Sequence, residues 1–260
     1  MMKPKISIIC CWLGINDCVV SANSINRLMT EDVDLEVVLI DSSANGKLAS
    51  LIECDHIRIK HIRYPKTTIY DAFNKGVTVS TSEWFVFLHE GDSFSPNFNF
   101  GTLFTAFNPD LDGNSLICCD YAIEHKAGLY FLRKNTVFKP LLGVMPIHVG
   151  VVCSRKLWEE IGYFDERITI SSDYDFLIRC YLVNAKFHYS REILGFMEGT
   201  GASRRRKWVA IYEDINIIRR HFGLWAIYAV FLKKIRFVTW YLISKFRGGI
   251  ELKYSTALNQ

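Results

Sequence analysis

The 260-residue chain lacks several features that would assign it to a simple class. Its eight cysteines include no pair spaced Cys-x-x-Cys, and the adjacent pairs Cys10–Cys11 and Cys118–Cys119 lie in apolar runs. This pattern predicts buried thiols in a reducing compartment and disfavours a disulfide scaffold or a zinc site. No internal repeat and no low-complexity linker is apparent, which excludes repeat arrays.

The sequence also lacks a long apolar run. Two apolar segments, 224–232 and 237–247, fall short of the roughly 20 residues that a helix needs to span a bilayer. The basic residues KKIR between them would lie at the bilayer centre, where charge is costly. The apolar start, MMKPKISIICCWLG, has no small-residue cleavage pattern after it, so we expect a first β-strand there rather than a signal peptide.

Charge is distributed unevenly along the chain. Residues 1–203 carry 19 Lys and Arg against 24 Asp and Glu, whereas residues 204–247 carry 11 against 2. Half of all residues are hydrophobic, which is enough for a sizeable core. We therefore expect a catalytic-looking domain over 1–203 and a basic, aromatic tail over 204–260 that meets an anionic partner.

Apolar runs alternate with helical patterns along the first ninety residues. We expect strands at 5–11, 35–41, 56–64 and 84–88, with helices at 17–30 and 67–80. Because each strand is nearly continuous in apolar residues, the alternation predicts an α/β fold with a mostly parallel central sheet flanked by helices. Ligands of such sheets bind beyond the carboxyl ends of the strands, where Asp41 and the sequence Glu90-Gly91-Asp92 lie.

Two carboxylates flank one glycine at the end of the apolar run WFVFL. Gly91 would let the backbone turn, and Glu90 and Asp92 could converge on a hard divalent cation. Mg²⁺ and Mn²⁺ prefer oxygen ligands and are held by one or two carboxylates together with substrate phosphates. Glu, Gly, Asp and Ser are also ordinary turn residues, so the motif taken alone favours a solvated turn.

A second pair of acids, Asp173 and Asp175, precedes a helical pattern. Ser171 or Ser172 could cap this helix, and acids in its first turn suit its dipole. Asp173 could instead accept a proton from a substrate hydroxyl. For Asp175, a functional role and a purely structural role stay open.

Four stretches together resemble the family 2 glycosyltransferases of the GT-A (Rossmann-like) fold, of the type that builds bacterial cell-surface polysaccharide or O-antigen. They are ISIICCWLG, LEVVLIDSSANG, IYDAFNKGVTVSTSEWFVFLHEGDSF and PIHVGVVCSRKLWEEIGYFDERITISSDYDFLIR, in that order within residues 5–203. The resemblance implies an inverting hexosyltransferase that uses a nucleotide-sugar donor, with UDP as the nucleotide, and Mn²⁺ or Mg²⁺.

The resemblance also implies roles for individual residues. Asp173 matches the general base that deprotonates the acceptor hydroxyl, and Glu90 and Asp92 match the outer positions of the metal-binding D-x-D motif. Donor binding is implied for Asp41, Asp71, Asn74, Lys75, Glu90, Gly91 and His148. Each has an ordinary alternative as a turn, helix-face or loop residue. Arg204 and Arg205 follow GTGAS directly and could grip a diphosphate, or form a solvated basic linker.

The chain departs from the family pattern at three points. Glu90 replaces the first Asp of D-x-D, Ser172 replaces the Glu that precedes the base, and IDSSANG lacks a second acid. These departures keep open a non-catalytic, sugar-nucleotide-binding member of the same fold. A nucleotidyltransferase ranks last, because CCWLGIND has no basic phosphate loop. Tyr70 and Trp84 are expected in the core.

The tail begins with an amphipathic pattern that predicts a helix packed on the body. Its apolar face would carry Trp208, Ile211, Ile215, Ile218 and Phe222. Aromatic residues interleaved with Lys and Arg farther on suit an anionic membrane surface. We therefore expect a cytoplasmic protein, peripheral at the inner face of the bacterial cytoplasmic membrane, with a lipid-diphosphate-linked saccharide as acceptor.

Alternatives to the membrane surface are a dimer interface or a second layer of core. Nucleic acid binding is disfavoured, because the basic stripe is joined to an acidic body with a metal motif. No motif specifies the oligomeric state, the transferred sugar or the linkage.

Overall fold

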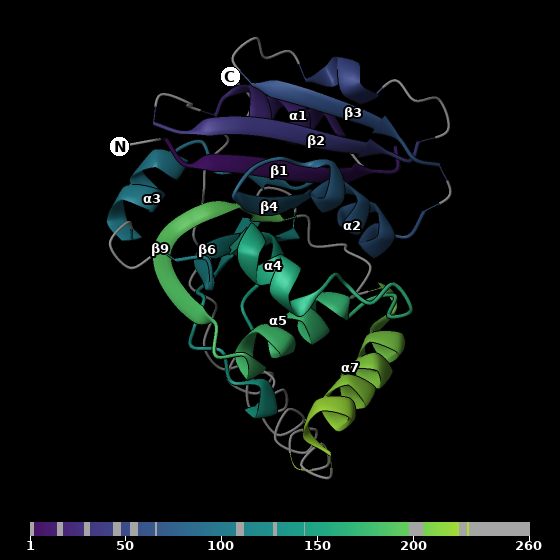
Figure 1. Cartoon of the computed structure of the whole chain (residues 1–260). Coiled ribbons are helices and arrows are strands. Elements are labelled where there is room, and N and C mark those ends of the chain that lie inside the picture. The colour runs from purple at the N-terminus through teal and green to yellow at the C-terminus, as the bar shows by residue number, and fades with distance from the viewer. Residues whose placement is uncertain are drawn as a thin grey trace.

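The computed structural model describes residues 3–14, 18–28, 32–43, 48–52, 57–65, 67–107, 112–126, 129–142, 144–197, 205–223 and 228. The described residues form one sheet of nine strands, ordered β3-β2-β1-β4-β8-β6-β9-β5, with β7 paired to β6 (Figure 1). Helices cover both of its faces, so the predicted α/β fold is confirmed.

The first half of the sheet is parallel, as expected. Its strands are β1 (Lys5–Trp12), β2 (Asp34–Asp41), β3 (Arg58–Arg63) and β4 (Trp84–His89). The second half is mixed, because β8 runs antiparallel to both β4 and β6, while β6 and β9 are parallel. Its strands are β5 (Ser93–Phe94), β6 (Ser115–Lys126), β7 (Leu129–Arg133), β8 (Val151–Ser154) and β9 (Lys186–Met197).

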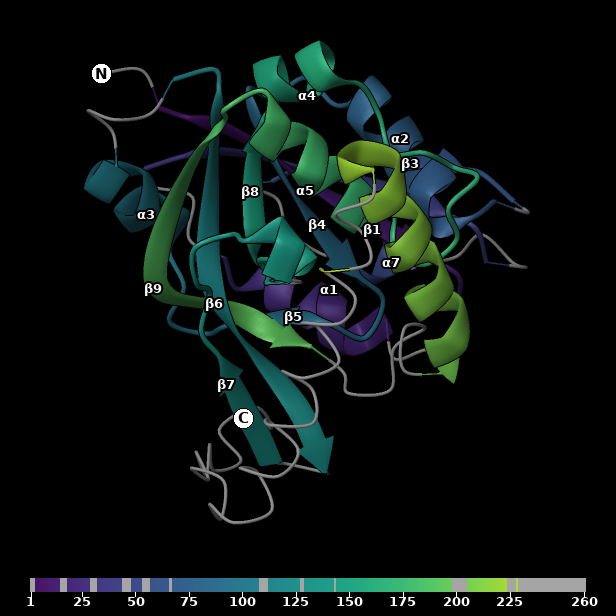
Figure 2. The ribbon, with the colours of Figure 1, turned by 90° about the horizontal axis from the view of Figure 1, so that it is seen from below.

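The helices separate into two layers. They are α1 (Cys18–Asn26), α2 (Ile69–Val79), α3 (Phe100–Phe107), α4 (Arg155–Ile161), α5 (Ser172–Leu182) and α7 (Lys207–Phe222), with short 3-10 helices η1 (Leu48–Leu51), η3 (Pro140–Leu142) and η4 (His148–Gly150). Helices α1 and α3 pack on one face of the sheet, and α2, α4 and α5 pack on the other. Figure 2 shows α7 beside α5.

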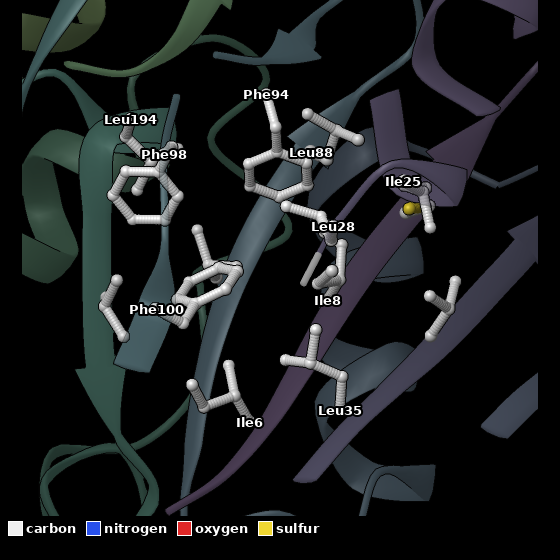
Figure 3. Close-up of a cluster of buried hydrophobic side chains, with 14 of the residues drawn as sticks. Ile6, Ile8, Ile25, Leu28, Leu35, Leu88, Phe94, Phe98, Phe100 and Leu194 are labelled. Atoms are coloured by element: carbon white, nitrogen blue, oxygen red, sulfur yellow. The ribbon is translucent and has the colours of Figure 1, made fainter. Parts of the chain in front are cut away.

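The core follows from the alternation of side chains along the strands. Ile6 and Ile8 of β1 point toward α1 and α3, where they meet Ile25 and Phe100 (Figure 3). Ile9 points the other way, into the cluster under α2 and α5. The seven described cysteines are all buried free thiols, as predicted: Cys10, Cys11, Cys18, Cys118, Cys119, Cys153 and Cys180.

The carboxyl ends of the parallel strands meet at one edge of the sheet. Trp12 at the end of β1 pairs with Asp41 at the end of β2, and Cys11 pairs with His89 at the end of β4. This register brings Asp41 and the turn after His89 to the same edge. The expectation that the strand ends converge is therefore confirmed.

The predicted amphipathic helix is present as α7, but its orientation differs from the expectation. Ile217 and Ile218 are its buried residues, whereas Trp208 is 81% exposed. Placing Trp208 on the packed face was therefore wrong. The helical period fixes which residues share a face, but the neighbouring elements decide how far the helix turns toward them.

In the part of the chain that the structure describes, none of the helices has the length and apolar character to cross a membrane.

Candidate active site

The turn after β4 is built around Gly91. Its φ of +87° lies in the left-handed region, which glycine adopts without steric cost. Ser21 of α1 is hydrogen-bonded to this turn twice. The Gly91 N–H donates to the Ser21 hydroxyl (3.1 Å), and that hydroxyl donates to the Asp92 carbonyl (2.7 Å). The neighbouring carboxylates, Glu90 and Asp92, are thereby fixed at the sheet edge rather than left on a solvated turn.

Both carboxylates of the turn are buried, Glu90 at 8% and Asp92 at 3% exposure. The two Glu90 oxygens accept hydrogen bonds from the Leu13 N–H (2.8 Å) and the Cys18 thiol (3.1 Å). Glu90 therefore ties the end of β4 to the loop after β1. Carboxylate oxygens are the donors that Mg²⁺ and Mn²⁺ prefer, so the binding of a cation by Glu90 and Asp92 stays a prediction.

Within the described residues, no group of three or more His, Cys, Asp or Glu side chains is arranged to hold a metal ion.

Asp41 is fully buried and accepts hydrogen bonds within the protein. Its donors are Ser43, through both its N–H (3.0 Å) and its hydroxyl (2.6 Å), and Arg63 (3.1 Å). His61 lies 3.1 Å away on the other carboxylate oxygen. Burial alone would raise the pKa of Asp41, but these hydrogen bonds and the Arg63 charge outweigh it and lower the pKa. Asp41 is thus an ionised anchor for the loop that begins at Ser42.

Asp71 lies in the first turn of α2. It accepts hydrogen bonds from the hydroxyls of Thr67 (2.5 Å) and Tyr64 (3.1 Å). Its negative charge reaches the buried Cys11 thiol, whose pKa is raised to about 12 by burial first and then by Glu90 and Asp71.

Asn74, one turn further along α2, clamps the loop between α4 and α5. Its amide donates to the Phe164 carbonyl (3.0 Å) and to Glu166 (2.8 Å), and it accepts from the Phe164 N–H (3.0 Å). These contacts give Asn74 a structural role. Lys75 beside it lines a surface groove of about 810 Å³ together with Asp71. Donor binding by these residues stays a prediction.

Two histidines belong to an aromatic cluster at the end of β4. The His148 ring of η4 stacks on Phe87, with ring centroids 5.0 Å apart and 23° between the planes. The His89 ring meets His148 edge to face, with centroids 5.8 Å apart. Burial, followed by the proximity of His89, keeps the pKa of His148 well below its usual range, and burial lowers that of His89 to about 4. Both rings are therefore neutral near pH 7.

The buried Nε2 of His148 has no hydrogen-bond partner among the described residues. The His148 ring is thus neutral, and its contact with a donor stays a prediction.

Asp173 is the second residue of α5 and lies beside Tyr70 of α2. The Tyr70 hydroxyl is 3.1 Å from Asp173 Oδ1 and donates to the Ile170 carbonyl at 2.5 Å. Burial raises the pKa of Asp173 to about 6, with hydrogen bonds from the Tyr174 N–H and Tyr70 opposing and the charge of Asp214 adding to the rise. A carboxylate with a pKa near 6 suits a general base that works at neutral pH.

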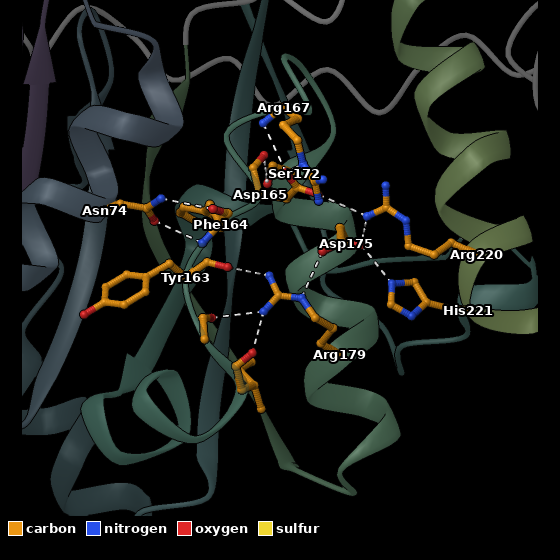
Figure 4. Close-up of polar contacts among 12 residues, drawn as sticks. Asn74, Tyr163, Phe164, Asp165, Arg167, Ser172, Asp175, Arg179, Arg220 and His221 are labelled. Carbon is orange, nitrogen blue, oxygen red and sulfur yellow. Dashed lines mark hydrogen bonds and ion pairs between the residues drawn. The ribbon is translucent and has the colours of Figure 1, made fainter.

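Asp175, two residues later, is part of a structural network (Figure 4). It is 2% exposed, pairs with Arg179 (2.9 Å), and bonds to His221 of α7 (2.8 Å). Burial alone would raise the pKa of Asp175, but His221 and Arg179 outweigh it, so its pKa is lowered. Asp175 is therefore an ionised link between α5 and α7.

The remaining sequence-predicted residues are placed as follows. Arg205 is exposed just before α7, and Arg204 lies outside the described residues. Ser172, which replaces the family's Glu, is buried and donates its hydroxyl to the Asp165 carbonyl (3.0 Å). The hydroxyl of the expected cap residue Ser171 lies 3.5 Å from the Ala210 carbonyl of α7 instead of capping α5.

Sequence reasoning missed four residues that build this site. Tyr70 was assigned to the core and is 5% exposed, yet its hydroxyl contacts Asp173. Cys18 and Ser21 hold the acidic turn, and His89 pairs with His148. A polar atom at a helical core position carries no sequence signal for its partner, because that partner comes from a distant segment.

No family model matches the sequence. The chain is similar to proteins described as PGL/p-HBAD biosynthesis glycosyltransferases from Mycobacterium bovis and Mycobacterium tuberculosis, at 27% identity over 155 residues. The match covers 57% of this chain and 59% of each relative. The chain thus spans less than two thirds of the length of these relatives.

Solved structures of Staphylococcus aureus TarS share the fold. The structure of TarS residues 1–349 in complex with UDP-GlcNAc superposes with a TM-score of 0.60 at 13% identity, covering 96% of this chain and 77% of that one. The complex with UDP gives a TM-score of 0.59 at 15% identity, covering 96% and 76%. At these identities the likeness concerns the fold alone. The comparisons show a chain with a glycosyltransferase fold and with sequence similarity to glycosyltransferases.

Proposed function

We propose that this protein is an inverting, metal-dependent family 2 glycosyltransferase. It transfers a hexose from a UDP-sugar to a hydroxyl of a lipid-diphosphate-linked saccharide during synthesis of bacterial surface polysaccharide of the O-antigen type. The acceptor oxygen attacks the anomeric carbon from the face opposite the nucleotide, and its proton passes to Asp173.

One observation carries this proposal: Asp173, a carboxylate with a raised pKa, lies against the Tyr70 hydroxyl in the first turn of α2, next to Asp71. A raised pKa suits a general base, and the Tyr70 contact would orient the carboxylate. Asp41 and the Glu90–Asp92 turn mark the strand edge where ligands of α/β sheets bind. The named relatives and the UDP-bound neighbours add support for a nucleotide-sugar donor.

The proposal assigns Asp92, supported by Glu90, to hold Mn²⁺ or Mg²⁺, which would neutralise charge on the leaving diphosphate. Gly91 leaves room beside the turn, because it carries no side chain. Asp41 and Asp71 would hold the nucleoside, with Asn74, Lys75, His148, Arg204 and Arg205 nearer the phosphates. These donor contacts are inferred from the resemblance.

Calorimetric titration of UDP, with and without Mn²⁺, tests the donor site. We expect binding that requires Mn²⁺ in the wild type and is weakened by at least tenfold in Asp92→Ala, because the variant lacks a charged ligand. Asp112→Ala, which removes an exposed aspartate paired with Lys186, is the matched control and should bind as the wild type does. Metal-independent binding would remove the cation role, and an absence of binding would contradict the UDP donor.

Turnover separates catalysis from mere binding. Release of UDP from UDP-GlcNAc and from other UDP-sugars should be measured with a bacterial lipid extract as the source of acceptor. Metal-dependent UDP binding without release under any of these conditions would favour the non-catalytic alternative.

The proposed membrane surface of the protein includes the outer face of α7. Trp208 and Tyr212 are 81% and 68% exposed on this face, and Arg205 and Arg219 are exposed near its ends. Aromatic rings beside cations suit the interface of an anionic bilayer. We propose that this face contacts the inner leaflet of the cytoplasmic membrane and brings the site to a lipid-linked acceptor.

Co-sedimentation with vesicles checks this membrane contact. Trp208→Ala should weaken binding to vesicles containing phosphatidylglycerol several-fold, because the exposed ring no longer enters the interface. Tyr163→Ala, which also removes a half-exposed aromatic ring but lies in the loop between α4 and α5, should bind as the wild type does. Equal binding of all three proteins, or no preference for anionic over neutral vesicles, would contradict the membrane role of this face.

A further inference from the structure

Glu213 of α7 is the centre of a dense set of hydrogen bonds. Its Oε1 accepts from both the N–H and the hydroxyl of Thr169, each at 2.8 Å. Its Oε2 accepts from the N–H groups of Ile170 (2.8 Å) and Ser171 (3.0 Å). One carboxylate thus receives four hydrogen bonds from three consecutive residues.

These three residues lead directly to the candidate base. Ser171 is the N-cap of α5, and Asp173 follows two residues later. The Ile170 carbonyl accepts the Tyr70 hydroxyl, which also contacts Asp173 Oδ1. The segment 169–171 is therefore held on one side by Glu213 and on the other by Tyr70, the residue that orients the base.

The electrostatics of the contact favour an ionised Glu213. Backbone N–H groups that converge at the start of a helix attract negative charge, and hydrogen bonds to a carboxylate are stronger than neutral ones. Burial alone would raise the pKa of Glu213, but the hydrogen bonds from Thr169, Ile170 and Ser171 outweigh it and lower the pKa. Glu213 therefore satisfies the N–H groups of the segment before α5, whereas the Tyr174 and Asp175 N–H groups in the first turn of α5 bond to the Ser171 carbonyl.

Helix α7 is anchored independently of Glu213. Ile217 and Ile218 are buried against the body, His221 bonds to Asp175, and Arg220 pairs with Asp165 (3.1 Å). Removing the Glu213 charge should therefore loosen the 169–171 segment without detaching the helix. This separation makes the role of Glu213 testable.

We propose that Glu213 is a positioning residue for Asp173, so that the helix beyond the sheet domain completes the candidate active site. Its carboxylate fixes the segment that carries the start of α5 and thereby sets the direction and the burial of the Asp173 carboxylate. The inference rests on the proposed function, which makes Asp173 the base. It gives α7 a second role beside the surface contact of its outer face.

The test compares Glu213→Gln with the wild type. Glutamine keeps the shape of the side chain, but it loses the charge and turns one acceptor into an NH₂ group that faces the backbone donors. We expect at least a tenfold lower kcat for UDP release from UDP-GlcNAc, with the affinity for UDP unchanged. The amides of Thr169, Ile170 and Ser171 should exchange with solvent at least tenfold faster.

Two further variants, one milder change and one control, are compared with Glu213→Gln by their kcat. Thr169→Val removes one of the four hydrogen bonds and should give a smaller loss in kcat. Glu160→Gln makes the same chemical change at an exposed position of α4 and should match the wild type. A fall in kcat with equal KM, graded in this order, is not expected from a general loss of folded protein.

The pKa of the Asp173 carboxyl, followed by carbon-13 NMR, provides a readout that needs no substrate. The groups that act on this carboxyl are Tyr70 of α2 and Asp214 of α7, together with the Tyr174 N–H. Both side chains stay in Glu213→Gln, and Thr169→Val, which keeps the Glu213 charge, separates a change in burial from the loss of that charge. We expect the pKa to fall toward the ordinary value of an aspartate, because a loosened segment admits water.

The outcomes separate this inference from the proposed function. An unchanged Asp173 pKa, or faster amide exchange with unchanged kcat, would overturn the positioning role while leaving the glycosyltransferase proposal intact. Turnover that survives Asp173→Asn would overturn the base and the positioning role together. If the wild type releases no UDP, the NMR titration decides alone: a lowered Asp173 pKa in both Glu213→Gln and Thr169→Val supports the positioning role, and an unchanged pKa in Thr169→Val overturns it.

Discussion

Asp173→Asn should abolish measurable sugar transfer, with a loss of about 10²–10⁴-fold in kcat, the range typical for removal of a general base. The amide cannot take the proton from the acceptor hydroxyl, but it keeps the shape of the side chain and its contact with Tyr70. The affinity for UDP should therefore stay unchanged. UDP release and calorimetry on the same preparation measure both quantities.

The pH profile provides a second check on Asp173. Because its pKa is raised to about 6, the carboxylate loses its ability to accept a proton as the pH falls through 6. Turnover by the wild type should fall below this pH and level off above it. A flat profile between pH 5 and pH 8 would contradict the base assignment.

The same substitution should stabilise the fold at neutral pH. Because its pKa is raised on folding, the Asp173 carboxyl binds a proton more tightly in the folded than in the unfolded state. Its contribution to stability is therefore fully present below its ordinary pKa and is lost as the pH rises through 6. Replacing the ionised group by an amide should regain about 1–3 kcal/mol of unfolding free energy at pH 7, allowing for partial screening. Urea unfolding at pH 4 and pH 7 measures it, and an equal difference at both pH values would contradict the argument.

Asp175→Asn should have the opposite effect, although the residue lies only two positions away. Asp175 is a buried partner of Arg179 and His221 and lies 3.7 Å from Arg220. Removing one member of a buried charged network leaves the others uncompensated, which costs about 3–5 kcal/mol. The variant should unfold at markedly lower urea concentration, measured by circular dichroism at pH 7.

Exposed charges on the same surface serve as controls for Asp175→Asn. Arg167→Gln removes an 85% exposed side chain that pairs with Asp165, and exposed pairs of this kind contribute little to stability. It should therefore unfold near the wild type. If Asp175→Asn were as stable as Arg167→Gln and inactive, Asp175 would be a functional residue rather than the link between α5 and α7.

The contrast between the two acids shows where sequence reasoning stopped. The pattern SSDYDFLIR predicted a helix with two acids in its first turn, and that helix is α5. Both acids suit the helix dipole equally well, so nothing local distinguishes them. Their roles diverge because their partners differ. Asp173 contacts Tyr70 of α2, whereas Asp175 contacts Arg179 of α5 and His221 of α7.

The directions of the strands in the mixed half of the sheet also could not be predicted from the sequence pattern. A buried strand is apolar whether its neighbours are parallel or antiparallel, so the apolar runs predicted strands without their directions. The pairing of β8 between β4 and β6 follows from the path of the chain through η4. Likewise, nothing in the pattern of the tail indicated that Glu213 would receive four hydrogen bonds from the segment before α5.

The sequence by itself determined the alternating strands and helices, the convergence of Asp41 and the Glu90–Asp92 turn at one edge, and the amphipathic helix after the sheet domain. These features depend on periodicity and on polar residues at strand ends, which are local properties of the chain. Only the tertiary structure decided the partners of Tyr70, Glu90 and Glu213. A polar group is satisfied by whichever donors or acceptors the packed elements bring to it, and these partners lie from tens of residues to more than a hundred away along the chain.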